Sequence, residues 1–374
     1  MLHIFRALLL SSILFPSLGY AQFWHVLPPI AEDKSVPTDI WNDQMKAYIR
    51  ALPMPREDRS VNAGFSNDEK KVFYLSPDSG IANIWSVTIA DKYGRIIAGP
   101  NNPPMQITKF TDRGIVRMFH LLNLPEILYM RLTNNGKDYH IYRTKDDGTG
   151  EPQDLTPGAG GVTSEIIGAS YNGRYVYYTE NAINHDKVDT YRYDTQQFTT
   201  DLIFPNDKDY RVLAWSRDNG RLLVEDPHSG DLLMFDISTT DRTPLVKSVS
   251  GPFVHALMDP TNHELIVVEK EGGQNVEREM EIGSNVSNVI ATGNITWIDY
   301  SPNGKYEIAQ NGGTWSMKDV ASGAEVLLSV GAHSIAIAPK ETMLLYKVAQ
   351  GNSGSKLFLY DIGKKTSIEL ATMK

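Results

Sequence analysis

The stretch Ser301-Pro302-Asn303-Gly304-Lys305 decides the fold, because close variants of it recur along the chain. The clearest variants are Ser66-Asn67-Asp68-Glu69-Lys70, Ser170-Tyr171-Asn172-Gly173-Arg174 and Ser216-Arg217-Asp218-Asn219-Gly220-Arg221, and weaker ones begin at Leu121, Asp259 and Ala338. An Asn-Gly or Asp-Gly step supplies the positive φ angles that a tight β-hairpin needs. Each copy therefore predicts a hairpin turn between two strands.

Short segments of alternating apolar and polar residues flank these turns, and no helical periodicity runs through them. A third segment with an aromatic residue and a shorter fourth segment complete each unit. The 315 residues from Ser60 to Lys374 divide into seven units of 45, and a four-stranded propeller blade takes about 40–50 residues. We therefore predict an all-β, seven-bladed β-propeller of four-stranded antiparallel blades over residues 60–374. The weak third segment of the fifth unit, Val276 to Met280, leaves six or eight blades as alternatives.

The composition excludes several classes of protein. The chain has no cysteine, so it has no disulfides, no thiolate metal site and no cysteine nucleophile. Its formal charge of −9 argues against nucleic acid as a partner. Beyond the N-terminus, no apolar stretch is long enough for a transmembrane helix.

Residues 1–21 have the three-part pattern of a secretory signal peptide. Arg6 lies in a short basic start, Ala7 to Leu18 form the apolar core, and Gly19 and Ala21 are the small residues before the cut. The alternative is a buried N-terminal helix. We expect export of the remaining 353 residues to the bacterial periplasm or the medium, because exported proteins without cysteine are typical of bacteria.

Residues 22–59 do not join the repeat. Pro28, Pro29 and Pro37 indicate a loop, and Thr38-Asp39 can cap a short helix from Ile40 to Leu52. We expect a strap that packs on the edge of the propeller, with a partner-binding helix as the alternative.

The turns of the Ser-Pro-Asn-Gly-Lys kind resemble those of TolB-like propeller repeats. The runs Asp147 to Pro157 and Asp189 to Thr195 resemble blade edges of propellers in the prolyl oligopeptidase family. This resemblance implies a propeller fold and transfers no catalytic residue. Members of that peptidase family add an α/β-hydrolase domain with a Gly-x-Ser-x-Gly motif. The nearest string here, Gly351-Asn352-Ser353-Gly354-Ser355, departs from that motif, so we expect a hairpin loop there and no hydrolase domain.

Propellers usually bind their ligands at one end of the central channel, near the start of each innermost strand. Alignment of the repeats on the turn places charged and aromatic residues at this depth, where a purely structural strand would be apolar. The candidate binding residues are Arg117, Glu165, Arg211, His255, Trp297 and His333. Together they predict a binding mouth.

Two classes of function are compatible with this pattern. The first is a non-catalytic module that holds a protein or peptide partner in the periplasm or cell envelope, with no cofactor, no bound metal and no catalytic residue; a sensor or assembly factor is a variant of it. The alternative is a channel-site enzyme, a lyase or hydrolase that acts on glycans or peptides. His120, His255 and His333 are the residues that could hold a metal in that enzyme.

Overall fold

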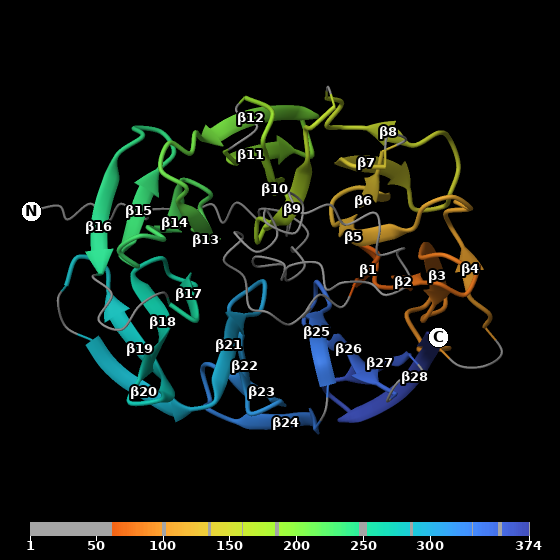
Figure 1. The fold of residues 1–374 in the computed structure, drawn as a ribbon. Coiled ribbons are helices and arrows are strands. Elements are labelled where there is room, and N and C mark those ends of the chain that lie inside the picture. Colours follow the sequence, from red (N-terminus) through yellow and green to blue (C-terminus); the bar gives the residue numbers. More distant parts are fainter. Residues whose placement is uncertain are drawn as a thin grey trace, which may run out of the picture.

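A computed structural model describes residues 62–98, 102–133, 136–158, 160–183, 187–246, 253–284, 287–330, 332–350 and 354–373. Within these ranges the chain forms seven four-stranded antiparallel sheets arranged as a ring (Figure 1). The predicted seven-bladed, all-β propeller is therefore confirmed. The predicted signal peptide at 1–21 and strap at 22–59 lie outside the described residues, as does most of the string Gly351 to Ser355.

Each blade is one continuous run of chain, numbered here from blade 1 to blade 7. The strands of blades 1 to 4 are β1 (Ala63–Phe65), β2 (Lys71–Ser76), β3 (Asn83–Thr88), β4 (Met105–Gln106); β5 (Ile115–Leu121), β6 (Glu126–Leu132), β7 (Tyr139–Lys145), β8 (Gln153–Asp154); β9 (Ser164–Ala169), β10 (Tyr175–Glu180), β11 (Asp189–Asp194), β12 (Thr199–Phe204); and β13 (Arg211–Trp215), β14 (Arg221–Glu225), β15 (Leu232–Asp236), β16 (Arg242–Val246). Those of blades 5 to 7 are β17 (His255–Met258), β18 (Glu264–Glu271), β19 (Gln274–Glu281), β20 (Ser287–Gly293); β21 (Ile295–Tyr300), β22 (Tyr306–Asn311), β23 (Thr314–Asp319), β24 (Glu325–Val330); and β25 (Ala332–Ile337), β26 (Met343–Ala349), β27 (Ser355–Asp361), β28 (Thr366–Met373).

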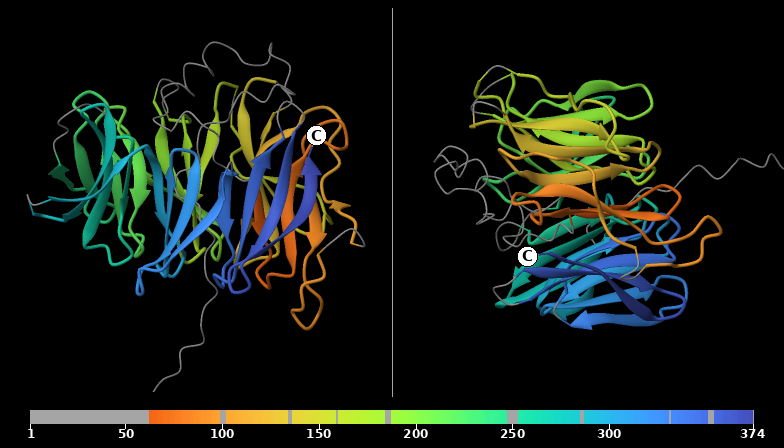
Figure 2. Two further views of the ribbon diagram at one scale, coloured as in Figure 1. Left: turned by 90° about the horizontal axis from the view of Figure 1, so that it is seen from below. Right: turned by 90° about the vertical axis from the view of Figure 1, so that its right-hand side faces the viewer.

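The first strand of every blade lines the centre of the ring, and the fourth lies on the outside (Figure 1). Figure 2 shows the blades from the side. We call the end of the ring where these inner strands begin the mouth end. The other end, where the first hairpin turn of each blade lies, is the turn end. The third strand of blade 5, which is weak in sequence, is the complete eight-residue strand β19. In the described parts of the chain, no helix is long and apolar enough to cross a membrane.

The blades are held together by apolar side chains between neighbouring sheets. One buried cluster joins blade 7 to blade 1, with Leu345 and Leu359 packed in the same core as Phe65 and Tyr74. Burial of such side chains stabilises a fold by about 1.5–3 kcal/mol each. In the described residues no sheet combines strands from the two ends of the chain, so apolar packing is the main contact that closes the ring.

The turns that predicted the fold also bind one another at the turn end. Their fourth residue has a positive φ, which suits glycine, yet several turns place Glu or Asn there: Glu69 (58°), Asn219 (62°), Asn262 (61°) and Glu341 (57°). Each of these side chains accepts a hydrogen bond from a neighbouring blade: Lys340 N to Glu69 Oε1 (2.5 Å), Asn303 N to Glu341 Oε1 (2.7 Å), Arg217 N to Asn262 Oδ1 (2.9 Å) and Tyr177 OH to Asn219 Oδ1 (3.1 Å). These bonds offset the left-handed backbone conformation, which costs about 1–2 kcal/mol per residue.

A glycine is required in the corresponding turn of blade 6. Gly304 has a φ of +73°, and a Cβ atom there would lie 2.7 Å from Cβ of Pro260 in blade 5. Nearby, the Arg217 guanidinium lies 4.0 Å from the ring centre of Tyr171 in blade 3 and donates to the Ser301 carbonyl in blade 6 at 3.0 Å. Arg217 belongs to blade 4, so its side chain reaches past blade 5, and the turns of these blades converge at this end of the channel.

Candidate binding mouth

The six candidate residues all lie on inner strands. Arg117 is in β5 and Glu165 in β9, and the others occupy the inner strands of blades 4 to 7: Arg211 in β13, His255 in β17, Trp297 in β21 and His333 in β25. The structure pairs Arg117 with Glu165 and His255 with Trp297. Arg211 pairs instead with Glu225, which is not one of the six. The side chain of His333 lies outside the part of the structure that is described.

Arg117 and Glu165 form a buried ion pair between blades 2 and 3. Arg117 Nη1 lies 2.9 Å from Glu165 Oε1 and donates to the Ile166 carbonyl at 2.9 Å. The two residues are only 1% and 3% exposed. Burial raises the pKa of Glu165 above its ordinary value, and Arg117 opposes that shift. The pair is therefore a cross-blade anchor, since each charge is neutralised by the other.

Arg211 forms a second ion pair, with Glu225 of the adjacent strand β14. The two residues are direct cross-strand partners, and Glu225 Oε1 also accepts a hydrogen bond from Phe253 N at 2.9 Å. Burial raises the pKa of Glu225, and Arg211 opposes the shift. Glu225 was missed in the sequence because the alignment covered inner strands only. Pairing each inner residue with its hairpin partner would have found it.

His255 and Trp297 stack on each other across blades 5 and 6. Their ring centres are 4.5 Å apart at an interplanar angle of 28°. His255 Nε2 lies 2.8 Å from the Ile298 carbonyl oxygen, which can only accept, so Nε2 carries a proton and donates it. That nitrogen therefore has no lone pair available for a metal in this tautomer.

His120, the third histidine of the metal alternative, lies deeper in β5. Its Nε2 is 3.2 Å from Asp146 Oδ2, and its ring stacks on Phe73 at 4.8 Å. Burial lowers the pKa of His120, which keeps the ring neutral. Among the residues that the structure describes, no three His, Asp or Glu side chains come together as a metal site.

A series of β-bulges interrupts the inner strands, near the mouth end in blades 2, 6 and 7 and further along the strand in blades 3 and 4. In the inner strands of blades 2, 3, 4, 6 and 7 the pairing with the second strand shifts by one residue. The bulged residues are Val116, Ile167, Leu213, Thr296 and His333. Val116, Leu213 and Thr296 are half-buried. Bulges redirect side chains and are common beside binding sites, so this ring of bulges gives the mouth its local shape.

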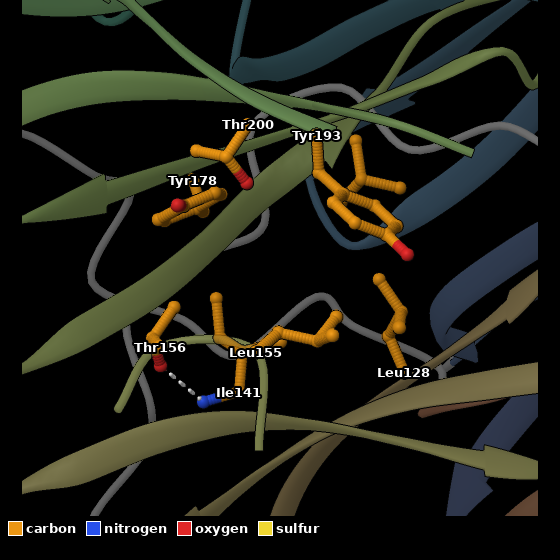
Figure 3. Close-up of a pocket in the computed structure, with 8 residues that line it drawn as sticks. Leu128, Ile141, Leu155, Thr156, Tyr178, Tyr193 and Thr200 are labelled. Carbon is orange, nitrogen blue, oxygen red and sulfur yellow. Dashed lines mark hydrogen bonds between the residues drawn. The ribbon is translucent and has the colours of Figure 1, made fainter. Parts of the chain in front are cut away.

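A small, partly open cavity lies away from the mouth, between blades 2 and 3 (Figure 3). Its lining is mostly apolar, with Leu128 and Ile141 on one side and Tyr178 and Tyr193 on the other, and Ile141 N donates to Thr156 Oγ1 at 2.9 Å. The centre of a water molecule can occupy only about 10 Å³ of this cavity. The cavity therefore holds at most one water molecule. This cavity is too small for a substrate.

Comparisons with known proteins match the fold. No protein-family model and no curated protein matches the chain. An oligogalacturonate lyase from Vibrio parahaemolyticus superposes with a TM-score of 0.58 at 10% identity, over 93% of this chain and 98% of the lyase. A puromycin hydrolase gives 0.57 at 12% identity, over 89% of this chain and 56% of the hydrolase. These likenesses show the fold alone.

TolB from Acinetobacter baumannii is also among the similar structures, with a TM-score of 0.49 at 13% identity, over 94% of this chain and 96% of TolB. Propellers of the TolB and peptidase kinds are thus among the structural neighbours, as the turn and blade-edge sequences predict. The chain spans only about half of the puromycin hydrolase, 56% of its length.

The chemistry of the mouth follows from these contacts. Two arginines are neutralised by buried glutamates, and one histidine is oriented by a backbone carbonyl. Groups held in this way are rigid, because moving any of them would leave a buried charge or donor without its partner. The arrangement supports a fixed binding surface around the bulged residues.

Proposed function

We propose that this chain is an exported, non-catalytic propeller that holds a protein or peptide partner at its mouth end. The observation that carries the proposal is the ring of inner-strand bulges, with Val116, Leu213 and Thr296 half-buried on the inner strands of three blades. These side chains are uncharged. A neutral, partly apolar surface on a rigid support suits the contact residues of a protein or peptide.

The internal ion pairs favour this proposal over a binding site for an anionic ligand, which would need unpaired arginines. Arg117 and Arg211 would attract an anionic ligand if they were unpaired, but each faces a buried glutamate. They stabilise the inner strands that present the bulges. Export to the periplasm or cell envelope is proposed from the signal-peptide pattern of residues 1–21 alone.

The competing proposal is a channel-site enzyme that acts on glycans or peptides, which the likeness to oligogalacturonate lyase makes worth testing. The two proposals differ in a simple measurement. A binding module leaves oligogalacturonates and peptides unchanged when the purified chain is supplied with divalent cations. An enzyme converts one of them, and substitutions in the channel abolish the conversion.

A charge placed at the mouth should release the partner. We expect Leu213→Glu to lower the amount of one specific protein recovered with the tagged chain from the exported fraction by about tenfold or more, because a carboxylate would be buried in the interface. Val320→Glu is the matched control: Val320 is exposed and lies in a turn at the turn end. Val116→Glu is the second variant. Because Leu213 and Val116 each also pack on a core cluster, both variants are first compared with wild type by thermal unfolding. Equal recovery with the folded mouth variants, or loss with Val320→Glu, would contradict the proposal.

A further inference from the structure

The negative charge of the chain is concentrated in blade 5. Between Phe253 and Asn294 there are seven acidic and two basic residues, a net charge of −5, against −9 for the whole chain. The acidic residues are Asp259, Glu264, Glu269, Glu271, Glu277, Glu279 and Glu281. The average acidity of the sequence therefore conceals one strongly acidic blade.

Strand register divides these acids between the two faces of blade 5. Cross-strand partners share a face, and the pairs Glu264↔Glu281, Ile266↔Glu279 and Val268↔Glu277 place four glutamates on one face of β18 and β19. On the opposite face, Arg278 binds Glu269 at 2.8 Å and also Glu271. The acids of that face are thus neutralised, whereas none of the four glutamates has a cation within 4.0 Å in the described structure.

Blade 6 adds one more carboxylate to this face. Glu307 of β22 interacts electrostatically with Glu277, as does Lys318, its cross-strand partner in β23. We call Glu264, Glu277, Glu279, Glu281 and Glu307 the acidic seam. Glu264 and Glu279 are in contact, because a hydrogen bond between their carboxyl groups raises the pKa of Glu264. The ammonium group of Lys318 faces the seam from β23. The phenol group of Tyr300 also lies beside the seam, near Glu307 and Glu277.

Glu277 is the deepest member of the seam. It is 5% exposed, and in the part of the chain that is described it has no hydrogen bond and no ion pair within 4.0 Å. Burial, Glu307 and Glu279 raise its pKa to about 7, and Lys318 opposes the shift. A buried carboxylate without a partner is unfavourable, and a cation that reaches Glu277 would relieve this cost.

The outer strand beside the seam is β20, and no strand in the described residues pairs with its outer edge. β20, which pairs with β19, contains no charged residue and no proline between Ser287 and Gly293, and Val289 is 53% exposed. Edge strands are usually protected by charge or proline against the addition of another strand. An extended peptide can therefore approach blade 5 along β20.

We propose that the acidic seam binds a lysine- or arginine-bearing, extended segment of a partner protein. Ammonium and guanidinium groups donate several hydrogen bonds each. The seam offers only acceptors apart from Lys318, Tyr300 and Lys270, which lies on the same face at the other end of β18 from Glu264. Glu264, Glu281 and Glu307 lie at the strand ends that face the turn end. The seam is thus a second surface, separate from the mouth, and this proposal does not depend on the first.

Binding of a simple basic peptide tests this proposal. The probe is a fluorescent peptide of alternating lysine and threonine, and its matched control alternates glutamate and threonine. We expect the purified full chain to bind only the lysine peptide, and Glu277→Gln and Glu279→Gln each to weaken binding about fivefold. Glu151→Gln, which removes the same charge from an exposed loop of blade 2, should leave the affinity unchanged.

The pH dependence has a definite sign. Below about pH 7 Glu277 is protonated and attracts no cation, and above it the carboxylate is ionised. Affinity for the lysine peptide should therefore rise as the pH rises through about 7, and Glu277→Gln should flatten this rise. Equal binding of the two peptides, or wild-type affinity in both Glu277→Gln and Glu279→Gln, would overturn the proposal. If Glu277→Gln fails to fold, the half-buried Glu279→Gln decides the outcome.

Discussion

Replacing Arg117 by alanine should lower the free energy of unfolding by about 3–5 kcal/mol, as measured by urea denaturation. The side chain is buried, and its Nη1 binds both Glu165 Oε1 and the Ile166 carbonyl at 2.9 Å. Removal of the guanidinium leaves the Glu165 carboxylate buried without its cation and loosens the contact between blades 2 and 3. A loss of less than about 1 kcal/mol would show that the pair is not an anchor.

Two further variants test whether this loss of stability is due to the burial of the ion pair. Lys364→Ala breaks an exposed pair of similar length, 2.8 Å between Nζ and Asp361 Oδ2, and should cost less than about 1 kcal/mol. The double variant Arg117→Met with Glu165→Leu removes both charges at once. We expect it to recover much of the stability that the single variant loses, because no buried charge then lacks a partner.

Replacing Trp215 by alanine is the second large change that we expect, with a loss of about 3–5 kcal/mol in the free energy of unfolding. The indole is 1% exposed, and its ring centre lies 4.4 Å from that of Tyr177 in blade 3. Its Nε1 donates to the Ala169 carbonyl at 3.1 Å, again across the blades. Alanine therefore leaves a cavity between blades 3 and 4 and an unpaired carbonyl.

Tryptophan-to-phenylalanine changes isolate that hydrogen bond. Trp215→Phe keeps most of the packing and should cost about 1–3 kcal/mol, because the Ala169 carbonyl loses its donor. Trp85→Phe is the matched control, since Nε1 of Trp85 has no partner among the described residues. It should cost clearly less. Equal losses in the two phenylalanine variants would mean that the bond across the blades contributes little.

The fold could be predicted because its signal is local. Each turn carries its own backbone requirement, and Gly304 in the Ser-Pro-Asn-Gly-Lys turn has the positive φ that the sequence predicts. Glu69 and Glu341 are less obvious, because a glutamate rarely adopts this conformation. The contact that stabilises this conformation is not local, because the carboxylate of each glutamate accepts a hydrogen bond from a backbone N–H of the preceding blade in the ring.

The candidate site could be predicted only in part. Counting from the turns placed Arg117, Glu165 and Trp297 on the inner strands, because strand length fixes their depth. The sequence does not show that Arg117 and Glu165 bind each other, since residues 48 positions apart meet only when two blades pack together. The bulges at Ile167 and Leu213 were also missed, because a bulge is a feature of strand pairing and not of one strand.

The acidic seam shows how strand register extends a sequence pattern. The run Glu264 to Glu281 is visibly acidic, but the sequence alone does not say which glutamates share a face. The pairing of β18 with β19 separates Glu269 and Glu271, which Arg278 neutralises, from Glu277 and Glu279, which have no cation within 4.0 Å in the described structure. Charge that is left unpaired in this way is the part available to a partner.

The most direct test of a partner at the mouth is site-specific photo-crosslinking in living cells. A photoreactive phenylalanine analogue replaces Leu213 at the mouth end or Val320 at the turn end, and the products are identified by mass spectrometry. We predict one discrete protein adduct from Leu213, recovered in the exported fraction, and none of that mass from Val320. No adduct from Leu213 and from Val116 in the folded protein, or the same adduct from Val320, would contradict the proposed function.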